Sequence, residues 1–595
     1  MLNKRQLKLT FLAATLAAIA SCSQSPTQQQ TLPETLKKNP LAEAIIKDTN
    51  ALVAIPSYRS EGRPSHEVQQ SFSKIKSVLD QRIEGFNQQQ QHLKIQNFEW
   101  RKNRANQPGD PYRLFGYRLG NGPEKLAFIT HLDTVAPGGM DWQPFQPRIE
   151  QRELHQTSQP FLVGRGAVDN KGPAMATLNI LQQLAKDYDA TPETLNNMTL
   201  EVWFDTSEET DMATPKFLAE NPQALPDLGI VFDASWCIRA EKGIERPQFF
   251  TSLGTTPKQG IWIHSINTPR DSPTNQIPSE TITILQSNDS KALDDLANQI
   301  QSDYQHYAFD DPEYRRAPMT VTRVSPTQLK LTTTVIGAQH GSVPYANREK
   351  GANPLVSITN FLAHLADNGA LQKNGLSQLS QFVAWTWGTK VFGEHHPALL
   401  QKQDEIFTTG TTYAITRLQT DPMNNKATLA VDIRYAVGHQ DKPWDGKTFG
   451  LLPGKSQFQS VFTQLTQAFN KHHQGSKISF NTGTRVTPDI RDTESPNFQL
   501  VNNAYRKVMG EDCPAHAIGG GTDAKGFLPL IAAGPMLGGI AGPPVNYHGI
   551  NEAVPLEMLL QSTTILYELA KEKILDSQSQ EKSTQLTKKN TATKM

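Results

Sequence analysis

Residues 128–139 read FITHLDTVAPGG, an apolar strand that runs into a pair of polar side chains. His131 and Asp133 are two residues apart, so in an extended segment both side chains point to the same face. Asp133 can then orient the His131 imidazole as a supporting carboxylate. Taken alone, such a pair is more often a chance occurrence near a turn, so the rest of the chain has to decide its role.

The segments around this strand alternate between helical and extended patterns. Amphipathic helix patterns cover 41–57 and 173–188, and apolar strands cover 113–119, 125–130 and 198–206. This alternation predicts an α/β layer with a buried, largely parallel sheet.

The pattern changes in the middle of the chain and then returns. Residues 249–486 mix strands and helices with irregular segments rich in Pro, Gly and Asn, whereas 487–574 resume the first pattern. We therefore expect one split domain, formed by 40–248 and 487–574, with a large α+β lid domain inserted over 249–486. The polar segment 575–595 is expected to be disordered.

Composition excludes several classes of protein. Lys and Arg number 58 against 58 Asp and Glu, so the zero net charge gives no support for a nucleic-acid partner. The three cysteines, Cys22, Cys237 and Cys513, exclude a disulfide scaffold and a structural zinc site made of several thiolates. We expect Cys237 and Cys513 to be buried free thiols.

The amino-terminal residues form a targeting segment. Basic residues precede an apolar run over 9–19 that is too short to span a bilayer well. The tetrapeptide Ile19–Cys22 resembles the bacterial lipobox, in which the cysteine becomes lipidated. This implies a lipoprotein signal peptide over 1–21, a flexible tether over 22–39, and anchoring of Cys22 in the cell envelope, at the outer membrane or periplasmic face of a Gram-negative cell. An ordinary signal peptide with an incidental cysteine is the alternative.

Four further polar motifs follow at the ends of predicted strands or helices. Taken alone, each motif is also explained without a functional role, for example as a helix cap or an exposed pair of acids. The candidate residues are Asp169 in GRGAVDNKG, Glu208 and Glu209 in SEET, Asp233 in FDAS, and His548 in NYHGINEAV. Together with His131 they form a mixed nitrogen and oxygen set that suits zinc, and also manganese or cobalt. Two metals that share one carboxylate need about five protein ligands, which leaves Glu208 as a general base.

In order and approximate spacing, the motifs HLDTV, GRGAVDNKG, SEET, FDAS and YHGINE resemble the co-catalytic dinuclear zinc peptidases and acylases. That family includes carboxypeptidase G, aminoacylase, carnosinase and desuccinylase. The pattern is most similar to the bacterial unspecific or Xaa-His dipeptidases. The resemblance covers about residues 40 to 570. It implies an α/β zinc-peptidase catalytic domain, with a mixed sheet flanked by helices, plus the inserted lid.

The resemblance also implies roles for the candidate residues. His131 and Asp233 would hold one of two zinc ions, Glu209 and His548 the other, and Asp169 would bridge them. Asp133 would support His131. Glu208 would take the proton from the attacking water and pass it to the leaving amine.

Three motifs in the lid resemble substrate-binding elements of the same family. His340, in GAQHGSVPYANREKGANP, resembles a lid histidine that closes over the site and donates to the oxyanion. Asn275 would contribute to the oxyanion pocket, and Arg434 would bind the substrate carboxylate through its planar fork. A surface histidine and a solvent-facing strand arginine are the alternatives. The segments 142–162 and 373–412 are insertions for which the family resemblance offers no counterpart.

These features predict a metallopeptidase that hydrolyses dipeptides or short peptides outside the cytoplasm. The long lid resembles that of the monomeric bacterial dipeptidase, in which one chain supplies what a dimer partner adds elsewhere, and this resemblance implies a monomer. A deacylase of N-acyl amino acids would use the same chemistry and remains a second hypothesis. A non-catalytic, metal-containing binding lipoprotein is a third.

Overall fold

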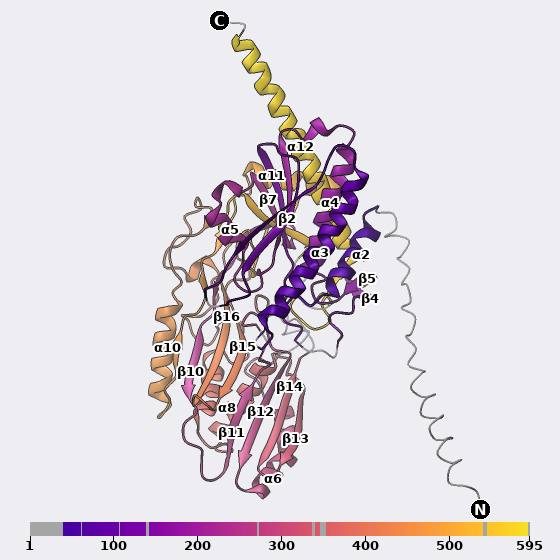
Figure 1. The fold of residues 1–595 in the computed structure, drawn as a ribbon. Coiled ribbons are helices and arrows are strands. Elements are labelled where there is room, and N and C mark those ends of the chain that lie inside the picture. Colours follow the sequence, from indigo (N-terminus) through magenta and orange to yellow (C-terminus); the bar gives the residue numbers. More distant parts are fainter. Residues whose placement is uncertain are drawn as a thin grey trace, which may run out of the picture.

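The computed structural model describes residues 40–592, apart from residues 61, 106, 139–141, 271–272, 336–339, 346–352 and 539–543. The predicted signal peptide, the lipidation of Cys22 and the tether lie outside the described residues. Two parts of the molecule are visible in Figure 1. One contains both ends of the described chain, and the other is built from the middle of the sequence.

A six-stranded mixed sheet is the centre of the first part, which we call the catalytic part. Its strands, in spatial order, are β1 (Gln96–Lys102), β2 (Tyr112–Leu119), β6 (Met198–Asp205), β3 (Glu124–His131), β7 (Leu228–Ser235) and β22 (Leu530–Met536). The last four run parallel, whereas β1 and β2 pair antiparallel. Every residue of β6 is buried, as a continuous apolar run in a covered sheet requires. The expected mixed sheet is confirmed.

Helices flank this sheet and complete its core. They are α2 (Ala42–Val53), α3 (Ser65–Gln89), α4 (Lys171–Tyr188), α5 (Thr214–Glu220), α11 (Pro496–Met509) and α12 (Leu556–Ala592). Capping residues set the ends of these helices. For example, the Ser495 side chain caps the start of α11 by accepting the Phe498 N–H, and Gly510, in the left-handed region, caps its end. One apolar cluster joins residues from Ala42 to Ile574, so the two ends of the chain share one core.

The second part, which we call the lid, has its own sheets and helices. Its strands are β10 (Gln248–Ser252), β11 (Ile261–Asn267), β12 (Glu280–Ser287), β13 (Met319–Ser325), β14 (Gln328–Thr334), β15 (Thr412–Asp421), β16 (Lys426–Tyr435) and β18 (Ser479–Asn481), and its helices are α6 (Ser290–His306), α8 (Pro354–Asp367), α9 (Gly375–Thr386) and α10 (Phe458–His472). Burial alternates along β12, so one face of its sheet packs on the lid helices. The Phe249 ring lies 5.1 Å from those of Phe382 and Phe462 in a separate apolar core.

Short strands connect the two parts. β9 (Gly243–Glu245) pairs with β16 and β19 (Arg485–Val486), whereas β8 (Ile238–Glu241) pairs with β20 (Asp489–Ile490) and β21 (His516–Ile518); β17 (Gly450–Leu451) extends the latter sheet. The insertion at 142–162 forms the hairpin of β4 (Arg148–Leu154) and β5 (Thr157–Val163), which pairs with β23 (Ala553–Pro555). The insertion at 373–412 contains α9 and a loop.

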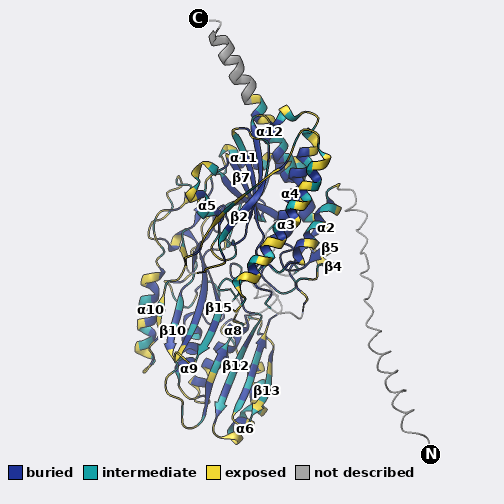
Figure 2. Ribbon diagram, in the orientation of Figure 1, coloured by how far each residue is buried: buried dark blue, intermediate teal, exposed yellow. Residues whose placement is uncertain are grey.

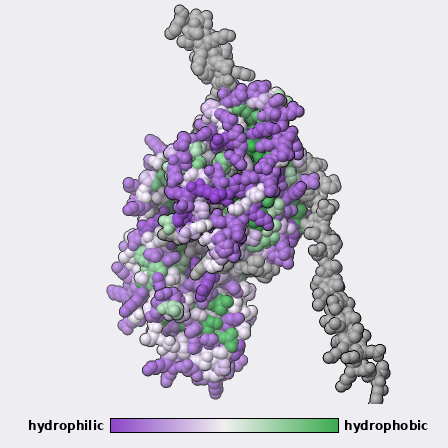
Figure 3. All heavy atoms as spheres, viewed as in Figure 1, coloured by the Kyte–Doolittle hydropathy of each residue, from purple (hydrophilic) through white to green (hydrophobic). Residues whose placement is uncertain are grey.

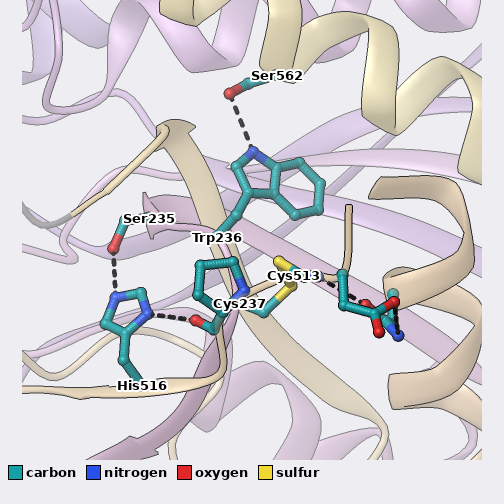
Figure 4. Close-up of a disulfide and its surroundings, with 9 residues drawn as sticks. Ser235, Trp236, Cys237, Cys513, His516 and Ser562 are labelled. Atoms are coloured by element: carbon teal, nitrogen blue, oxygen red, sulfur yellow. Dashed lines mark hydrogen bonds between the residues drawn. A yellow bond between two sulfur atoms is a disulfide. The ribbon is translucent and has the colours of Figure 1, made fainter. Parts of the chain in front are cut away.

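The expectation of two free thiols is wrong. Cys237 and Cys513 form a disulfide, with their Cα atoms 5.8 Å apart (Figure 4). They are 276 residues apart in sequence, and the parallel pairing of β8 with β21 brings them together. Sequence spacing alone could not reveal this contact, because it depends on the position of two strands on opposite sides of the lid insertion.

The carboxyl-terminal segment differs from the expected disordered tail. Helix α12 continues through this segment to Ala592. After Pro555 the sequence contains no Gly or Pro and is rich in Lys, Gln and Glu, which have good helix propensity. Low hydrophobicity led us to expect disorder, although the backbone preference of these residues favours helix.

The surface of the molecule is mainly polar. Figure 2 shows buried strands inside both parts and exposed residues on the outer faces of helices such as α10. In Figure 3 hydrophilic residues dominate the visible face, with a few small apolar patches. Among the described helices, none is both long enough and apolar enough to cross a bilayer.

Candidate metal centre and substrate cavity

Three neighbouring parallel strands bring most of the predicted site together. β6, β3 and β7 lie side by side, so their carboxyl ends meet at one edge of the sheet. His131 is the last residue of β3, Glu208 and Glu209 follow β6, and Asp233 lies near the end of β7.

Asp169 comes from the loop before α4. A buried carboxylate, Glu552, holds this loop: it accepts the backbone N–H groups of Gly166 at 2.9 Å, Val168 at 3.2 Å and Asp169 at 3.3 Å. Glu552 also pairs with buried Arg165. The segment that contains Glu552 also contains His548, so one stretch of chain fixes both the Asp169 loop and a second candidate ligand.

The five candidate ligands converge around Asp169. Its Oδ1 lies 2.9 Å from His131 Nε2, and its Oδ2 lies 3.1 Å from His548 Nε2. Each histidine also has one further carboxylate beside it. Asp233 Oδ1 is 3.5 Å from His131 Nε2, and Glu209 Oε2 is 3.2 Å from His548 Nε2. Asp169 therefore stands between two groups, each with one imidazole and one further carboxylate.

Asp133 supports this arrangement, but partly through its backbone. His131 Nδ1 lies 3.0 Å from the Asp133 carbonyl oxygen and 3.5 Å from the Asp133 carboxylate. The carboxylate itself accepts the backbone N–H groups of Glu208 at 3.1 Å and Glu209 at 3.2 Å. The sequence suggested a carboxylate that orients one imidazole, whereas Asp133 also fixes the loop that carries both glutamates.

The concentration of buried acids controls the protonation of the site. Burial disfavours charge on His131, but Asp233, Asp133 and Asp169 raise the pKa of His131 well above its ordinary value. In the same way Glu209 and Asp169 overcome burial and raise the pKa of His548 to about 10. The negative charge that raises these two pKa values also attracts a divalent cation.

The donor set fits metal ions. One ligand atom from each of His131, Asp169 and Glu209 lies within 4.8 Å of the others, and the same holds for His131, Glu208 and Asp233. Glu209 Oε1 is buried and has no hydrogen-bond partner among the described residues. Buried polar atoms are normally paired, so this oxygen has the coordination capacity that a cation would use.

A cavity of about 460 Å³ lies over this centre. Its walls include the metal-site acids and all three lid residues predicted from sequence: Asn275, His340 and Arg434. The His340 ring centroid is only 4.3 Å from that of His548. The lid is therefore closed over the candidate metal centre.

His340 is oriented as a hydrogen-bond donor. Its Nδ1 accepts the Ser342 backbone N–H at 3.0 Å, so in the neutral ring Nε2 carries the hydrogen. Burial lowers the pKa of His340 well below its ordinary value, and His548 and Arg434 lower it further. Asn275 lies beside it, because the Gly341 N–H donates to the Asn275 carbonyl at 2.6 Å.

Arg434 is buried rather than facing solvent. Its Nε donates to Asp432 at 2.8 Å and its Nη1 donates to the Gly519 carbonyl at 2.8 Å. Arg246 pairs with the same aspartate at 3.0 Å and also lines the cavity. Asp432 thus positions two cationic side chains at the wall of the cavity.

Several supporting residues were not predicted from sequence. Arg59 pairs with Asp110 at 2.6 Å and lies 3.7 Å from Asp133, and Asn170 Nδ2 donates to Asp233 at 2.5 Å. Asn170 lies in the same motif as Asp169, and Glu552 lies in the same motif as His548. Their closeness in sequence to candidate ligands could have identified them as supporting residues. Arg59 had no such signal.

The insertion at 373–412 contributes to a second cavity. It has a volume of about 820 Å³ and is lined in part by Phe392, Gln401 and Thr408. Tyr345 and Thr409 line both cavities. The insertion therefore extends the walls around the substrate cavity.

Comparisons with known proteins cover most of the chain. The model of peptidase family M20/M25/M40 matches residues 127–572. A Staphylococcus saprophyticus protein named "Putative dipeptidase" is 24% identical over 458 residues, which are 76% of this chain and 83% of that protein. A protein of the same name from Staphylococcus aureus strain USA300 is 23% identical over 459 residues, with the same shares of 76% and 83%.

Solved structures give a weaker likeness. Human carnosine dipeptidase 1 is 13% identical, with a TM-score of 0.49, and the match covers 91% of this chain and 98% of that one. An aminoacylhistidine dipeptidase from Vibrio alginolyticus is also 13% identical, with a TM-score of 0.39 and coverage of 90% and 97%.

Proposed function

This chain belongs to peptidase family M20/M25/M40, and from that premise we propose that it hydrolyses the amide bond of dipeptides or short peptides with two zinc ions, outside the cytoplasm. The observation that carries the proposal is the position of Asp169 between two histidine and carboxylate groups, at the base of a closed cavity. The donor set suits zinc, and manganese or cobalt would also fit it.

His131 with Asp233, and His548 with Glu209, would hold the two cations, with Asp169 between them. Bound there, the cations would supply Lewis acidity and lower the pKa of water. No other described residue is required as a ligand in this scheme.

Glu208 is positioned to move protons in the reaction. It lines the cavity, and one of its carboxylate oxygens lies within 4.8 Å of the ligand atoms of His131 and Asp233. From there it would take a proton from the attacking water and deliver it to the leaving amine.

The lid residues would act on the substrate. Nε2–H of His340 would donate to the oxyanion that develops on the scissile carbonyl, with Asn275 beside it. Arg434 would bind the terminal carboxylate, because a guanidinium matches the two carboxylate oxygens. All these groups come from one chain, which supports action as a monomer.

Two observations support a location outside the cytoplasm. The amino-terminal sequence resembles a lipoprotein signal with Cys22 as the lipidated residue. The Cys237–Cys513 disulfide is typical of an oxidising compartment. We propose that Cys22 anchors the chain to the cell envelope.

The proposal is tested by assaying dipeptides before and after chelation, and in Glu208→Gln. The change to Gln removes the base but keeps the shape of the side chain, so we expect activity to fall about 10²- to 10⁴-fold while two metal ions per chain are retained. Unchanged activity would contradict the role of Glu208. Hydrolysis of N-acyl amino acids without dipeptides would identify a deacylase, and ligand binding without metal would favour a binding lipoprotein.

A further inference from the structure

Ser235 and His516 line the substrate cavity, yet the proposed reaction gives them no role. Ser235 ends β7, two residues after Asp233, so both side chains lie on the same face of the strand. Two residues of strand span about 6–7 Å. Ser235 is therefore about one substrate residue away from the candidate metal centre.

The hydrogen bonds of His516 define how the Ser235 hydroxyl is oriented. His516 Nδ1 lies 2.9 Å from the Pro514 carbonyl oxygen, which can only accept, so Nδ1 carries the hydrogen. In the neutral ring Nε2 then accepts, and it lies 3.0 Å from Ser235 Oγ. The Ser235 hydroxyl hydrogen points to His516, and the oxygen is left as a hydrogen-bond acceptor.

This pair is held rigidly by the disulfide region (Figure 4). Cys513 lies three residues before His516, and the His516 N–H donates to the Cys237 carbonyl at 3.1 Å. On the other side, Trp236 Nε1 donates to Ser562 Oγ at 3.0 Å. A fixed acceptor loses little entropy when a ligand binds to it, so it can discriminate between similar substrates.

The cavity also contains the carboxylates of the candidate metal centre and of Asp211, but the residues next to this pair are apolar. Ala234 and Ala517, next to Ser235 and His516 in sequence, and Ile518 are apolar residues on the same cavity wall. Ala234, Ala517 and Ile518 have no side-chain acceptor. A hydrogen-bond donor of the substrate beside them would therefore donate to the Ser235 oxygen.

We propose that Ser235, oriented by His516, accepts a hydrogen bond from the free α-ammonium group of the amino-terminal residue of the substrate. This rests on the proposed peptidase function and deepens it. An ammonium group offers three donors to an acceptor oxygen, whereas an acyl group at the same position lacks that charged donor. The pair thus selects dipeptides over N-acyl amino acids.

The test uses two substrates that differ in the amino group alone: Ala-Ala and N-propionyl-alanine. In the metal-loaded wild-type protein we expect a higher kcat/KM for Ala-Ala. Ser235→Ala should lower that value about tenfold and change the value for N-propionyl-alanine less than about twofold. Ser235→Thr, which keeps a hydroxyl, should restore most of the preference, and His516→Ala should give a smaller loss because the hydroxyl remains but is no longer oriented.

Ser562→Ala is the matched control. It removes another buried hydroxyl beside the same disulfide region, on the side of Trp236, and should lower stability without changing the ratio of the two substrates. Calorimetric binding of phosphinic Ala-Ala analogues, with and without the amino group, measures the same preference independently of turnover.

The outcomes separate the two proposals. Equal losses for both substrates in Ser235→Ala, or no wild-type preference for the amino group, would overturn the role of Ser235. If the wild type binds the analogues but cleaves neither substrate, the peptidase function fails, and the binding ratio still decides the role of Ser235.

Discussion

The catalytic part and the lid both face the same cavity, but they hold their polar residues in different ways. His131, Asp169 and Asp233 lie at the end of a buried sheet and are linked by backbone and carboxylate hydrogen bonds. His340 lies in a lid loop that is held by Gln276 and Asn275 of the same lid, and its ring contacts that of His548. In the proposed mechanism, the catalytic part therefore assembles the candidate metal centre, and the lid selects and polarises the substrate.

Asp169→Asn should have the largest effect, because both candidate metal positions share this carboxylate. We expect dipeptide hydrolysis to fall about 10³-fold or more, together with a loss of bound metal measured by elemental analysis. Asp187→Asn, at the exposed far end of the helix α4 that follows Asp169, is the control and should keep both. If Asp169→Asn retained full metal content and activity, the bridging role would be wrong.

His340→Ala should separate the lid from the metal centre. Loss of one donor to the oxyanion is expected to lower kcat about 10²- to 10³-fold while metal content stays at the wild-type value. His364→Ala, a lid histidine on α8, is the matched control. A fall in the metal content of His340→Ala would contradict the assignment of metal binding to the catalytic part alone.

The paired change Cys237→Ser with Cys513→Ser tests the stability of the catalytic part. Removing a disulfide that closes a long loop is expected to lower the free energy of unfolding by roughly 2–5 kcal/mol. Thermal unfolding with and without reductant measures this, and reductant should lower the Tm of the wild type but not that of the double variant. Equal sensitivity of both proteins to reductant would contradict the prediction.

The smallest effect is expected in the lid, at His395. The hydrogen bond to Asp310, at 2.6 Å, raises the pKa of His395 above its ordinary value. Because the folded value is the higher one, this pair stabilises the protein fully below the ordinary histidine pKa and the contribution disappears as the pH rises through the folded value.

Denaturant unfolding of wild type and His395→Gln across pH 5.5 to 8.5 measures this contribution. The difference should be largest at the acidic end and stay below about 1 kcal/mol, because this partly exposed pair, with side chains 24% and 31% exposed, is screened by solvent. A difference that grows with pH would contradict the predicted sign.

Sequence patterns predicted the local elements well, because strand and helix periodicity depends on neighbouring residues. The strand expected at 125–130 is β3, Glu124–His131, and the helix expected at 173–188 is α4, Lys171–Tyr188. The five candidate ligands were proposed from sequence because each lies at the end of a predicted strand or in a loop beside a predicted strand or helix. Arg59 and the contact between Cys237 and Cys513 were missed, since both depend on tertiary pairing between distant segments.

The disulfide has a consequence for the covalent topology of the molecule. The loop it closes, 238–512, contains the whole predicted lid over 249–486, so the two halves of the catalytic part are joined twice: once through the lid and once through sulfur. A protease cut anywhere in the lid would therefore leave a single molecule, with both halves of the metal centre still connected. Separation into two fragments would require a reductant as well as a denaturant.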